Sequence, residues 1–212
     1  VTTSTLHDPT EDPINPDRHV ACADCHNAHA AQSSVPGSLH APGSLVGVKG
    51  MTAAGTLINP VTKEYELCYR CHADSIARGE AAVTRQFSQT NKRFQFATGN
   101  ASFHPVEVVG RNSNVPSLIA PWTASSVMTC TDCHNNNEGP GASGTGARGP
   151  HGSVFAPILE RNLVLLDFQD ETSGTYALCY KCHSRSAILA DESFPHRLHV
   201  VDNKASCVTC HD

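Results

Sequence analysis

Apolar residues along this chain occur in short runs that Gly, Pro, Asn and Ser interrupt, so the pattern predicts little regular structure. Two stretches favour helices, about Lys63 to Ala82 and about Gly174 to Leu189. Three others favour long loops, at 35–60, 99–121 and 135–150. We therefore expect a mostly irregular fold with a few short α-helices and little or no β-sheet.

The composition leaves little material for a core of side chains. Hydrophobic residues make up 39% and aromatic residues 6% of the 212 positions. Long loops without regular structure normally count against a compact domain. A fold of this kind needs another source of apolar surface.

Every cysteine of the chain belongs to a repeated motif, Cys-x-x-Cys-His. This spacing is typical of covalent c-type haem attachment, in which each thiol forms a thioether and the histidine binds the iron. We therefore expect five covalently bound haem c groups, whose flat apolar surfaces take the place of a side-chain core. The five copies are Cys22/Cys25/His26, Cys68/Cys71/His72, Cys130/Cys133/His134, Cys179/Cys182/His183 and Cys207/Cys210/His211.

Zinc binding and redox chemistry are the alternative interpretations of such cysteine pairs. A zinc ribbon needs a second pair roughly 15–20 residues after the first. Here 42, 58, 45 and 24 residues separate each pair from the next. Neither alternative requires a histidine directly after the second cysteine, yet all five pairs have one.

Each haem iron needs a second axial ligand, usually histidine or methionine. The chain has only two methionines, Met51 and Met128, whereas its free histidines are numerous enough to give every haem two. Two histidine ligands favour a low reduction potential and close the iron to substrates, so these residues favour electron transfer over catalysis. The eight histidines outside the motifs are His7, His19, His29, His40, His104, His151, His196 and His199.

The motifs are arranged in an internal repeat. A Cys-x-Asp-Cys-His motif precedes a Tyr-x-Leu-Cys-Tyr-(Arg/Lys)-Cys-His motif within 22–72 and again within 130–183, and a third pass begins at Ser206. From Arg18 onward the chain resembles the doubled-CxxCH multihaem c-type cytochromes of metal-reducing and related bacteria. The stretches that carry the resemblance are 19–29, 149–153, 178–183 and 199–207.

The resemblance implies a set of second iron ligands. In that family a histidine shortly before a motif, or three residues after it, commonly binds the far face of a haem, which implicates His19, His29 and His199. His104 matches the family's His-Pro-Val variant and His151 its His-Gly-Ser element, although insertions separate both from their motifs. The remaining candidates are His7, His40 and His196.

The fifth motif ends one residue before the end of the sequence, so its second ligand must come from upstream or from another chain. We expect a Pro-rich N-terminal arm (1–18) that is poorly ordered by itself and a pentahaem cytochrome unit (19–212) with a soft division near 110. One hypothesis, by similarity to extracellular cytochrome filaments, is that an N-terminal histidine such as His7 ligates a haem of a neighbouring subunit. The alternative is an arm that wraps its own chain.

Charge and hydropathy limit the partners. The net charge is −5, and no basic patch of the kind that nucleic acid requires is present. No run approaches the roughly 20 apolar residues of a membrane span. Because haem is joined to Cys-x-x-Cys-His outside the bacterial cytoplasm, we expect an exported protein that is periplasmic, on the cell surface or extracellular.

These observations lead to one leading expectation and one alternative. The leading expectation is a non-enzymatic electron-transfer protein, a pentahaem c-type cytochrome that acts either as a carrier or as a subunit of a conductive filament. Its partners would be other redox proteins or extracellular electron acceptors, with a ligand shared between subunits in the filament form. The alternative is a multihaem reductase with one open haem site.

Overall fold

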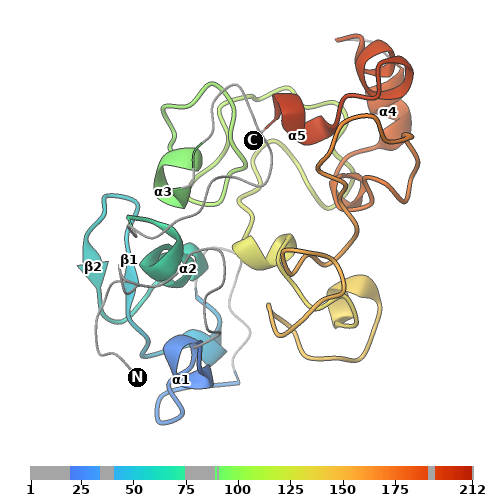
Figure 1. Cartoon of the computed structure of the whole chain (residues 1–212). Helices are drawn as coiled ribbons and strands as arrows, with labels where there is room; N and C mark the ends of the chain where they lie inside the picture. The colour runs from blue at the N-terminus through green and yellow to red at the C-terminus, as the bar shows by residue number, and fades with distance from the viewer. Residues whose placement is uncertain (1–19, 34–40, 75–88, 90, 191–193, 212) are drawn as a thin grey trace. The chain divides into compact units, whose positions relative to one another are not determined.

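The computed structural model describes residues 20–33, 41–74, 89, 91–190 and 194–211. These residues are mostly irregular, with short helical turns and one two-stranded sheet, as the sequence predicts (Figure 1). They divide into two compact units. The first unit lies within Val1–Ala81 and Ser88–Val108, and the second unit lies within Val109–Asp212.

The first unit contains a small antiparallel sheet and one helix longer than a single turn. In the sheet Gly50 lies opposite Ile58 and Met51 opposite Leu57. The elements in order are α1 (Cys22–Cys25), the 3₁₀ turn η1 (Gly43–Leu45), β1 (Gly50–Met51), β2 (Leu57–Ile58), α2 (Glu64–His72) and α3 (Lys92–Gln95).

The second unit is built from single turns joined by long irregular segments. Its described residues include no strand longer than an isolated bridge. The elements in order are the 3₁₀ turns η2 (Cys130–Asp132), η3 (Pro140–Ala142) and η4 (Cys179–Lys181), then α4 (Arg185–Leu189), the π-helical turn η5 (Arg197–Asp202) and α5 (Cys207–Cys210).

Helix α2 forms because its first turn is capped by its own side chain. The Glu66 carboxylate accepts hydrogen bonds from the backbone N–H groups of Thr62 (2.6 Å) and Lys63 (2.9 Å). These donors lie at the helix start, where no intrahelical acceptor exists. The helix ends at His72, because Ala73 leaves the helical conformation, so the predicted extension towards Ala82 is wrong at residues 73–74. Residues 75–82 lie outside the described residues.

The predicted helix from Gly174 to Leu189 is also wrong, because two separate turns replace it. Backbone groups of the 174–178 segment pair with a distant segment instead of with each other: Leu178 N–H donates to Asn162 O, and Val164 N–H donates to Thr175 O. The residue equivalent to Glu66 is Ala177, which cannot cap a helix. α4 starts afresh where the Ser184 hydroxyl accepts the Ala187 N–H.

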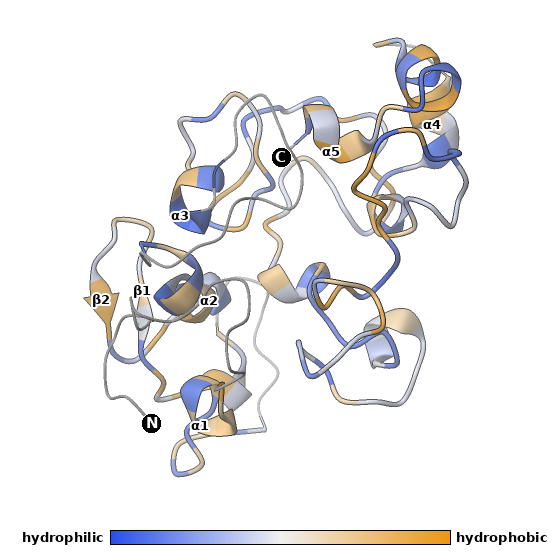
Figure 2. Cartoon of the chain, viewed as in Figure 1, coloured by the Kyte–Doolittle hydropathy of each residue, from blue (hydrophilic) through white to orange (hydrophobic). Residues whose placement is uncertain are grey.

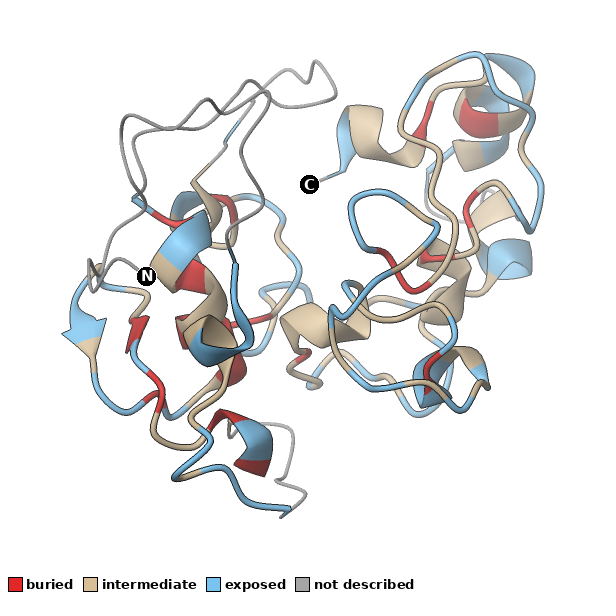
Figure 3. Cartoon of the chain, turned by 60° about the horizontal axis from the view of Figure 1, so that its bottom comes forward, coloured by how far each residue is buried: buried red, intermediate tan, exposed pale blue. Residues whose placement is uncertain are grey.

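Side-chain packing supplies only a small apolar core. The clearest cluster joins Leu45, Val48 and Val61 beside the sheet of the first unit, and the buried residues there gather around β1 and α2 (Figure 3). Hydrophobic residues also occur in short stretches outside this cluster (Figure 2), and several large apolar side chains are exposed. Phe168 is 80% exposed and Val154 78% exposed.

The remaining predictions about organisation concern parts that the structure does not describe. The N-terminal arm (1–18) and the candidate ligands His7, His19 and His40 lie outside the described residues. None of the described helices combines the length and the apolarity needed to cross a membrane.

Candidate haem-attachment sites

All five Cys-x-x-Cys-His motifs lie on a helical turn, which is α-helical in α1, α2 and α5 and 3₁₀ in η2 and η4. The second motif lies within α2. In each of the other four, the histidine N–H donates to the carbonyl of the first cysteine, which brings the two thiols to neighbouring positions on one turn. These four hydrogen bonds are His26 to Cys22 (2.8 Å), His134 to Cys130 (2.8 Å), His183 to Cys179 (3.0 Å) and His211 to Cys207 (3.0 Å).

Two of the motif histidines have an imidazole whose tautomer is set by a backbone carbonyl. His26 Nδ1 lies 3.0 Å from Ser44 O, and His134 Nδ1 lies 3.0 Å from Pro157 O. A carbonyl oxygen can only accept, so Nδ1 carries the proton and the lone pair falls on Nε2. Metal-binding histidines are commonly oriented in this way. His183 Nδ1 lies 2.9 Å from the Ser117 hydroxyl, which can donate or accept, so this contact orients the ring without setting its tautomer.

An aspartate inside two of the motifs fixes the start of its turn. Asp24 accepts the Ala21 N–H at 2.8 Å, and Asp132 accepts the Thr129 N–H at 2.7 Å. In both cases the donor belongs to the residue just before the first cysteine. The aspartate therefore satisfies a backbone group that the short turn cannot pair internally.

The fifth motif has Thr209 in place of that aspartate and obtains a carboxylate from a distant segment. Asp167 Oδ1 accepts hydrogen bonds from the Ser206 N–H and the Thr209 hydroxyl, both at 2.7 Å. These bonds lower the pKa of Asp167, the bond from Ser206 having the larger effect. Asp167 thus plays the same part for the fifth turn that Asp24 plays for the first.

A cationic side chain ties neighbouring motifs together in each unit. Arg70 donates to Asp24 O at 3.0 Å in the first unit, and Lys181 donates to Asp132 O at 2.6 Å in the second. Both cations occupy the position before the second cysteine of their motif. The first and second motifs are therefore joined, and the third and fourth motifs are joined by the equivalent contact.

The thiols confirm that the motifs are close to one another within each unit. Burial and the nearby thiols of Cys71 and Cys68 raise the pKa of Cys25. Burial raises the pKa of Cys133 to about 11, with a further contribution from Cys182.

The fourth and fifth motifs meet through their first cysteines. A hydrogen bond between the Cys179 and Cys207 thiols raises the pKa of Cys179, which burial raises further, and lowers the pKa of Cys207. The structure describes all ten cysteines and joins none of them in a disulfide. The fourth motif therefore lies next to both the third and the fifth.

The structure brings one distant candidate ligand back to a motif. His151 follows His134 by 17 residues in sequence. The Asn135 side chain accepts the Gly149 N–H at 2.7 Å, and Asn136 N–H donates to Gly149 O at 3.0 Å. The loop that the sequence predicts at 135–150 therefore closes on itself and returns His151 to the neighbourhood of the third motif.

A buried hydrogen bond likewise holds the segment that carries His104 next to the second motif. Tyr69, inside the second motif, donates from its hydroxyl to Glu107 at 2.6 Å, and both side chains are buried. Burial raises the pKa of Glu107, and the Tyr69 hydrogen bond opposes that effect. The segment that carries His104 is thereby attached to α2.

The other described candidates are His29, His196 and His199. His29 lies three residues after His26 and is exposed, and its backbone N–H donates to the Asn27 side chain. His199 Nδ1 lies 2.9 Å from Pro195 O, which places its lone pair on Nε2 as in His26. The rings of both His196 and His199 pack against Phe194, each at 5.0 Å between ring centres.

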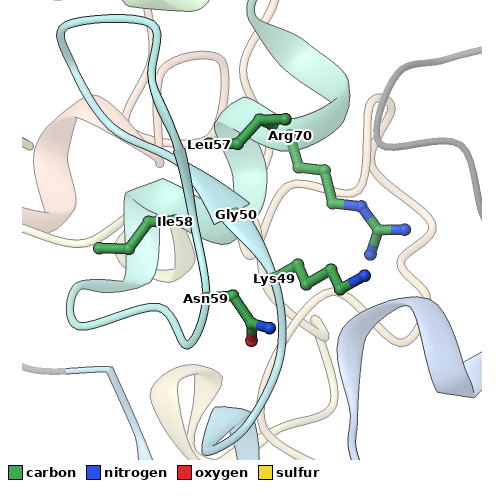
Figure 4. A pocket seen from close by; sticks show the side chains of 6 residues that line it. All are labelled: Lys49, Gly50, Leu57, Ile58, Asn59 and Arg70. Carbon is green, nitrogen blue, oxygen red and sulfur yellow. The ribbon is translucent and has the colours of Figure 1, made fainter.

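The pocket beside the second motif is not a haem cavity. It has a volume of about 260 Å³ and is lined by Lys49, Gly50, Leu57, Ile58, Asn59 and Arg70. The Lys49 and Arg70 side chains extend in the same direction beside β1 (Figure 4). None of the candidate cysteines or histidines lines it.

The donor set fits a haem iron. Among the described residues, no three His, Cys, Asp or Glu side chains gather as a bare metal ion would require. A haem iron needs only two protein ligands, one on each face, because the porphyrin fills its other positions. Paired thiols on one turn, followed by an imidazole, would supply the two attachment points and one of these two ligands.

Sequence reasoning missed the residues that support the motifs, Asp167, Arg70 and Lys181. A signal for the two cations was present, because both repeats place a basic residue before the second cysteine. No comparable signal marks Asp167, which lies 40 residues before Cys207.

No family model matches the chain, and neither a curated protein nor a solved structure shows significant similarity to it.

Proposed function

We propose that this chain is an exported pentahaem c-type cytochrome that transfers electrons and does not catalyse a reaction on a substrate. The observation that carries the proposal is that all ten cysteines lie in five Cys-x-x-Cys-His motifs, each of which lies on a helical turn. The resemblance to doubled-CxxCH cytochromes supports the same function.

The residues of each motif have separate tasks. The two cysteines would anchor the haem, and the motif histidine would bind the iron through Nε2. The carbonyls of Ser44 and Pro157 hold two of these imidazoles in the required tautomer. A bound haem supplies reversible one-electron oxidation and reduction of its iron.

The arrangement of the motifs supports transfer from one haem to the next within each unit. The first and second motifs are joined through Arg70, and the third and fourth through Lys181. The fourth and fifth meet at Cys179 and Cys207. In the second unit the fourth motif is therefore the central member of a series of three.

The apolar surface of the chain also supports haem binding. Large apolar side chains such as Val20, Val154 and Phe168 are more than 70% exposed, while the described core is small. Burying apolar area contributes roughly 25 cal/mol per Å². Haems covering such side chains would stabilise a fold that the side chains alone do not.

A reductive titration followed by optical spectroscopy tests the proposed function. Purified protein from a host that matures c-type cytochromes should take up five electrons per chain, with spectra of low-spin haem throughout. Uptake of fewer electrons, or a high-spin fraction that binds small substrates in the native protein, would contradict a pure electron-transfer role and favour the reductase.

Negative-stain electron microscopy of the same sample, over a dilution series, separates the two forms of the proposal. Unbranched filaments with a regular repeat identify a filament subunit whose partners include its own copies. Discrete particles at every concentration identify a carrier whose partners are other redox proteins or extracellular acceptors.

A further inference from the structure

The ring of His196 lies almost parallel to that of His211, the histidine of the fifth motif. Their ring centres are 6.3 Å apart, and their planes differ by 19°. The two residues come from different turns, since His196 precedes η5 and His211 follows α5. The sequence does not show which histidine is the second iron ligand at the fifth motif, as it does not show this for the other four.

This separation matches the span of one metal ion between two imidazoles. A metal–imidazole nitrogen bond is about 2.0–2.1 Å, and an imidazole centre lies about 1.1 Å from its own nitrogen, so two rings on opposite sides of a metal have centres about 6.2–6.4 Å apart. Ring centres of direct aromatic pairs lie about 4.5–7 Å apart, so the distance also fits ring packing, and the test below distinguishes the two.

The Phe194 side chain contacts both His196 and the neighbouring candidate His199. Its ring meets His196 edge-on and stacks on His199, both with 5.0 Å between centres. His199 is held further by its Nδ1 bond to Pro195 O. The two histidines of this segment therefore contact one aromatic ring in different orientations, and of the two only His196 has a described ring contact with His211.

We infer that His196 is the second axial ligand of the haem attached at Cys207 and Cys210, opposite His211. This inference rests on the proposed function, since it needs a haem at the fifth motif. The fifth iron then has both protein ligands within this chain, and neither His7 nor a neighbouring subunit is needed to complete it.

The test uses the haem-loaded protein and two substitutions at one position. His196→Ala should leave five haems by mass and convert about one-fifth of the haem to high spin, measured by electron paramagnetic resonance and magnetic circular dichroism. His196→Met should restore low spin and show the far-red absorption of a methionine–iron bond, with a raised potential for one haem. Leu198→Ala, an exposed neighbour on η5, is the matched control and should keep five low-spin haems.

A second background assigns the effect to the fifth haem. In Cys207→Ser/Cys210→Ser, which should carry four haems, His196→Ala should add no further high-spin signal. If it does add one, His196 serves another haem and the inference is overturned. The inference also fails if five haems stay low spin in His196→Ala. By contrast, a wild-type protein without covalent haem would overturn the proposed function itself.

Discussion

At the scale of single residues, the most consequential side chain is Lys181, because it connects a motif to a buried carboxylate. Its ammonium lies 2.8 Å from Glu160 Oε1, and the Glu160 side chain is only 1% exposed. Lys181 also donates to Asp132 O across the motif pair. Charged groups this deeply buried are tolerated only when they are paired.

Lys181→Met should therefore destabilise the haem-loaded protein by about 3 kcal/mol, because it leaves the Glu160 carboxylate buried without its cation. Asn135 and Arg161 remain near that carboxylate, which keeps the loss at the lower end of the usual range. Denaturant unfolding followed by Soret absorbance measures the change. Lys204→Met removes an exposed cation paired with Asp170 and should not change the free energy of unfolding measurably. Equal losses of stability in the two variants would contradict the role of burial.

A second residue-scale prediction concerns acid stability. The Arg185 guanidinium, followed by the Tyr180 hydroxyl, hydrogen-bonds the Glu171 carboxylate and lowers the pKa of Glu171 below its ordinary 4.5. The folded protein therefore binds this proton more weakly than the unfolded chain. Its stabilising contribution is complete above about pH 4.5 and is lost as the pH falls through the lower folded pKa.

Glu171→Gln should accordingly flatten the fall in stability below pH 4.5 and lower stability above it. Thermal unfolding midpoints between pH 3 and 7 measure both effects. Glu138→Gln, which changes an exposed side chain of the same unit, serves as the control. A pH profile of Glu171→Gln that parallels the parent protein would contradict this assignment.

The chemistry-bearing residues could be recognised from sequence because their spacing is local. Cys-x-x-Cys-His is complete within five positions, and the structure places every copy on a helical turn. The supporting residues could not be recognised in this way. Asp167 binds Ser206, which is 39 positions away, and the sequence around neither residue indicates this contact.

At the scale of elements, the two repeats show how one residue changes local structure. Glu66 caps α2, whereas Ala177 stands at the equivalent place in the second repeat. The sequence predicts helices for both repeats because their apolar and aromatic residues are alike. The second repeat remains a 3₁₀ turn because its backbone pairs with residues 162–164.

The packing of β1 on α2 leads to a prediction at this scale. A Cβ at Gly50 would collide with the Glu66 carbonyl of α2 and with the Val61 side chain. Gly50→Ala should therefore destabilise the first unit by about 1–3 kcal/mol, as overpacking of a filled site does. Gly99→Ala, where a Cβ meets nothing within 4 Å, should change stability by less than about 0.5 kcal/mol.

Unfolding midpoints of these two glycine variants, compared at equal haem content, measure the predicted difference in stability. A Gly50→Ala protein as stable as Gly99→Ala would show that α2 does not approach β1 so closely. Equal haem content is required, because incomplete attachment would lower stability for a different reason.

At the scale of the whole molecule, the chain has little apolar core of its own. Long irregular segments connect single turns, and several large apolar side chains are exposed. The general character of this fold followed from composition and from the density of Gly, Pro, Asn and Ser. The pairing of motifs within each unit did not, because it depends on contacts such as Arg70 to Asp24, which are 46 positions apart.

We therefore expect the polypeptide without haem to remain unfolded. Protein produced without haem attachment should show no near-ultraviolet circular dichroism of fixed aromatic side chains, whereas the haem-loaded protein should show it. The physical reason is that the described side-chain core joins only a few residues, such as Leu45, Val48 and Val61. A native-like aromatic signal from the haem-free chain would contradict this expectation.

The measurement that tests the central claim most directly is the intact mass of the denatured protein, purified from a host that matures c-type cytochromes. Covalent attachment at all five motifs predicts the 22.6 kDa polypeptide plus the mass of five haems, retained under denaturing conditions. The bare polypeptide mass, or a mass lowered only by the hydrogens lost on disulfide formation, would contradict it.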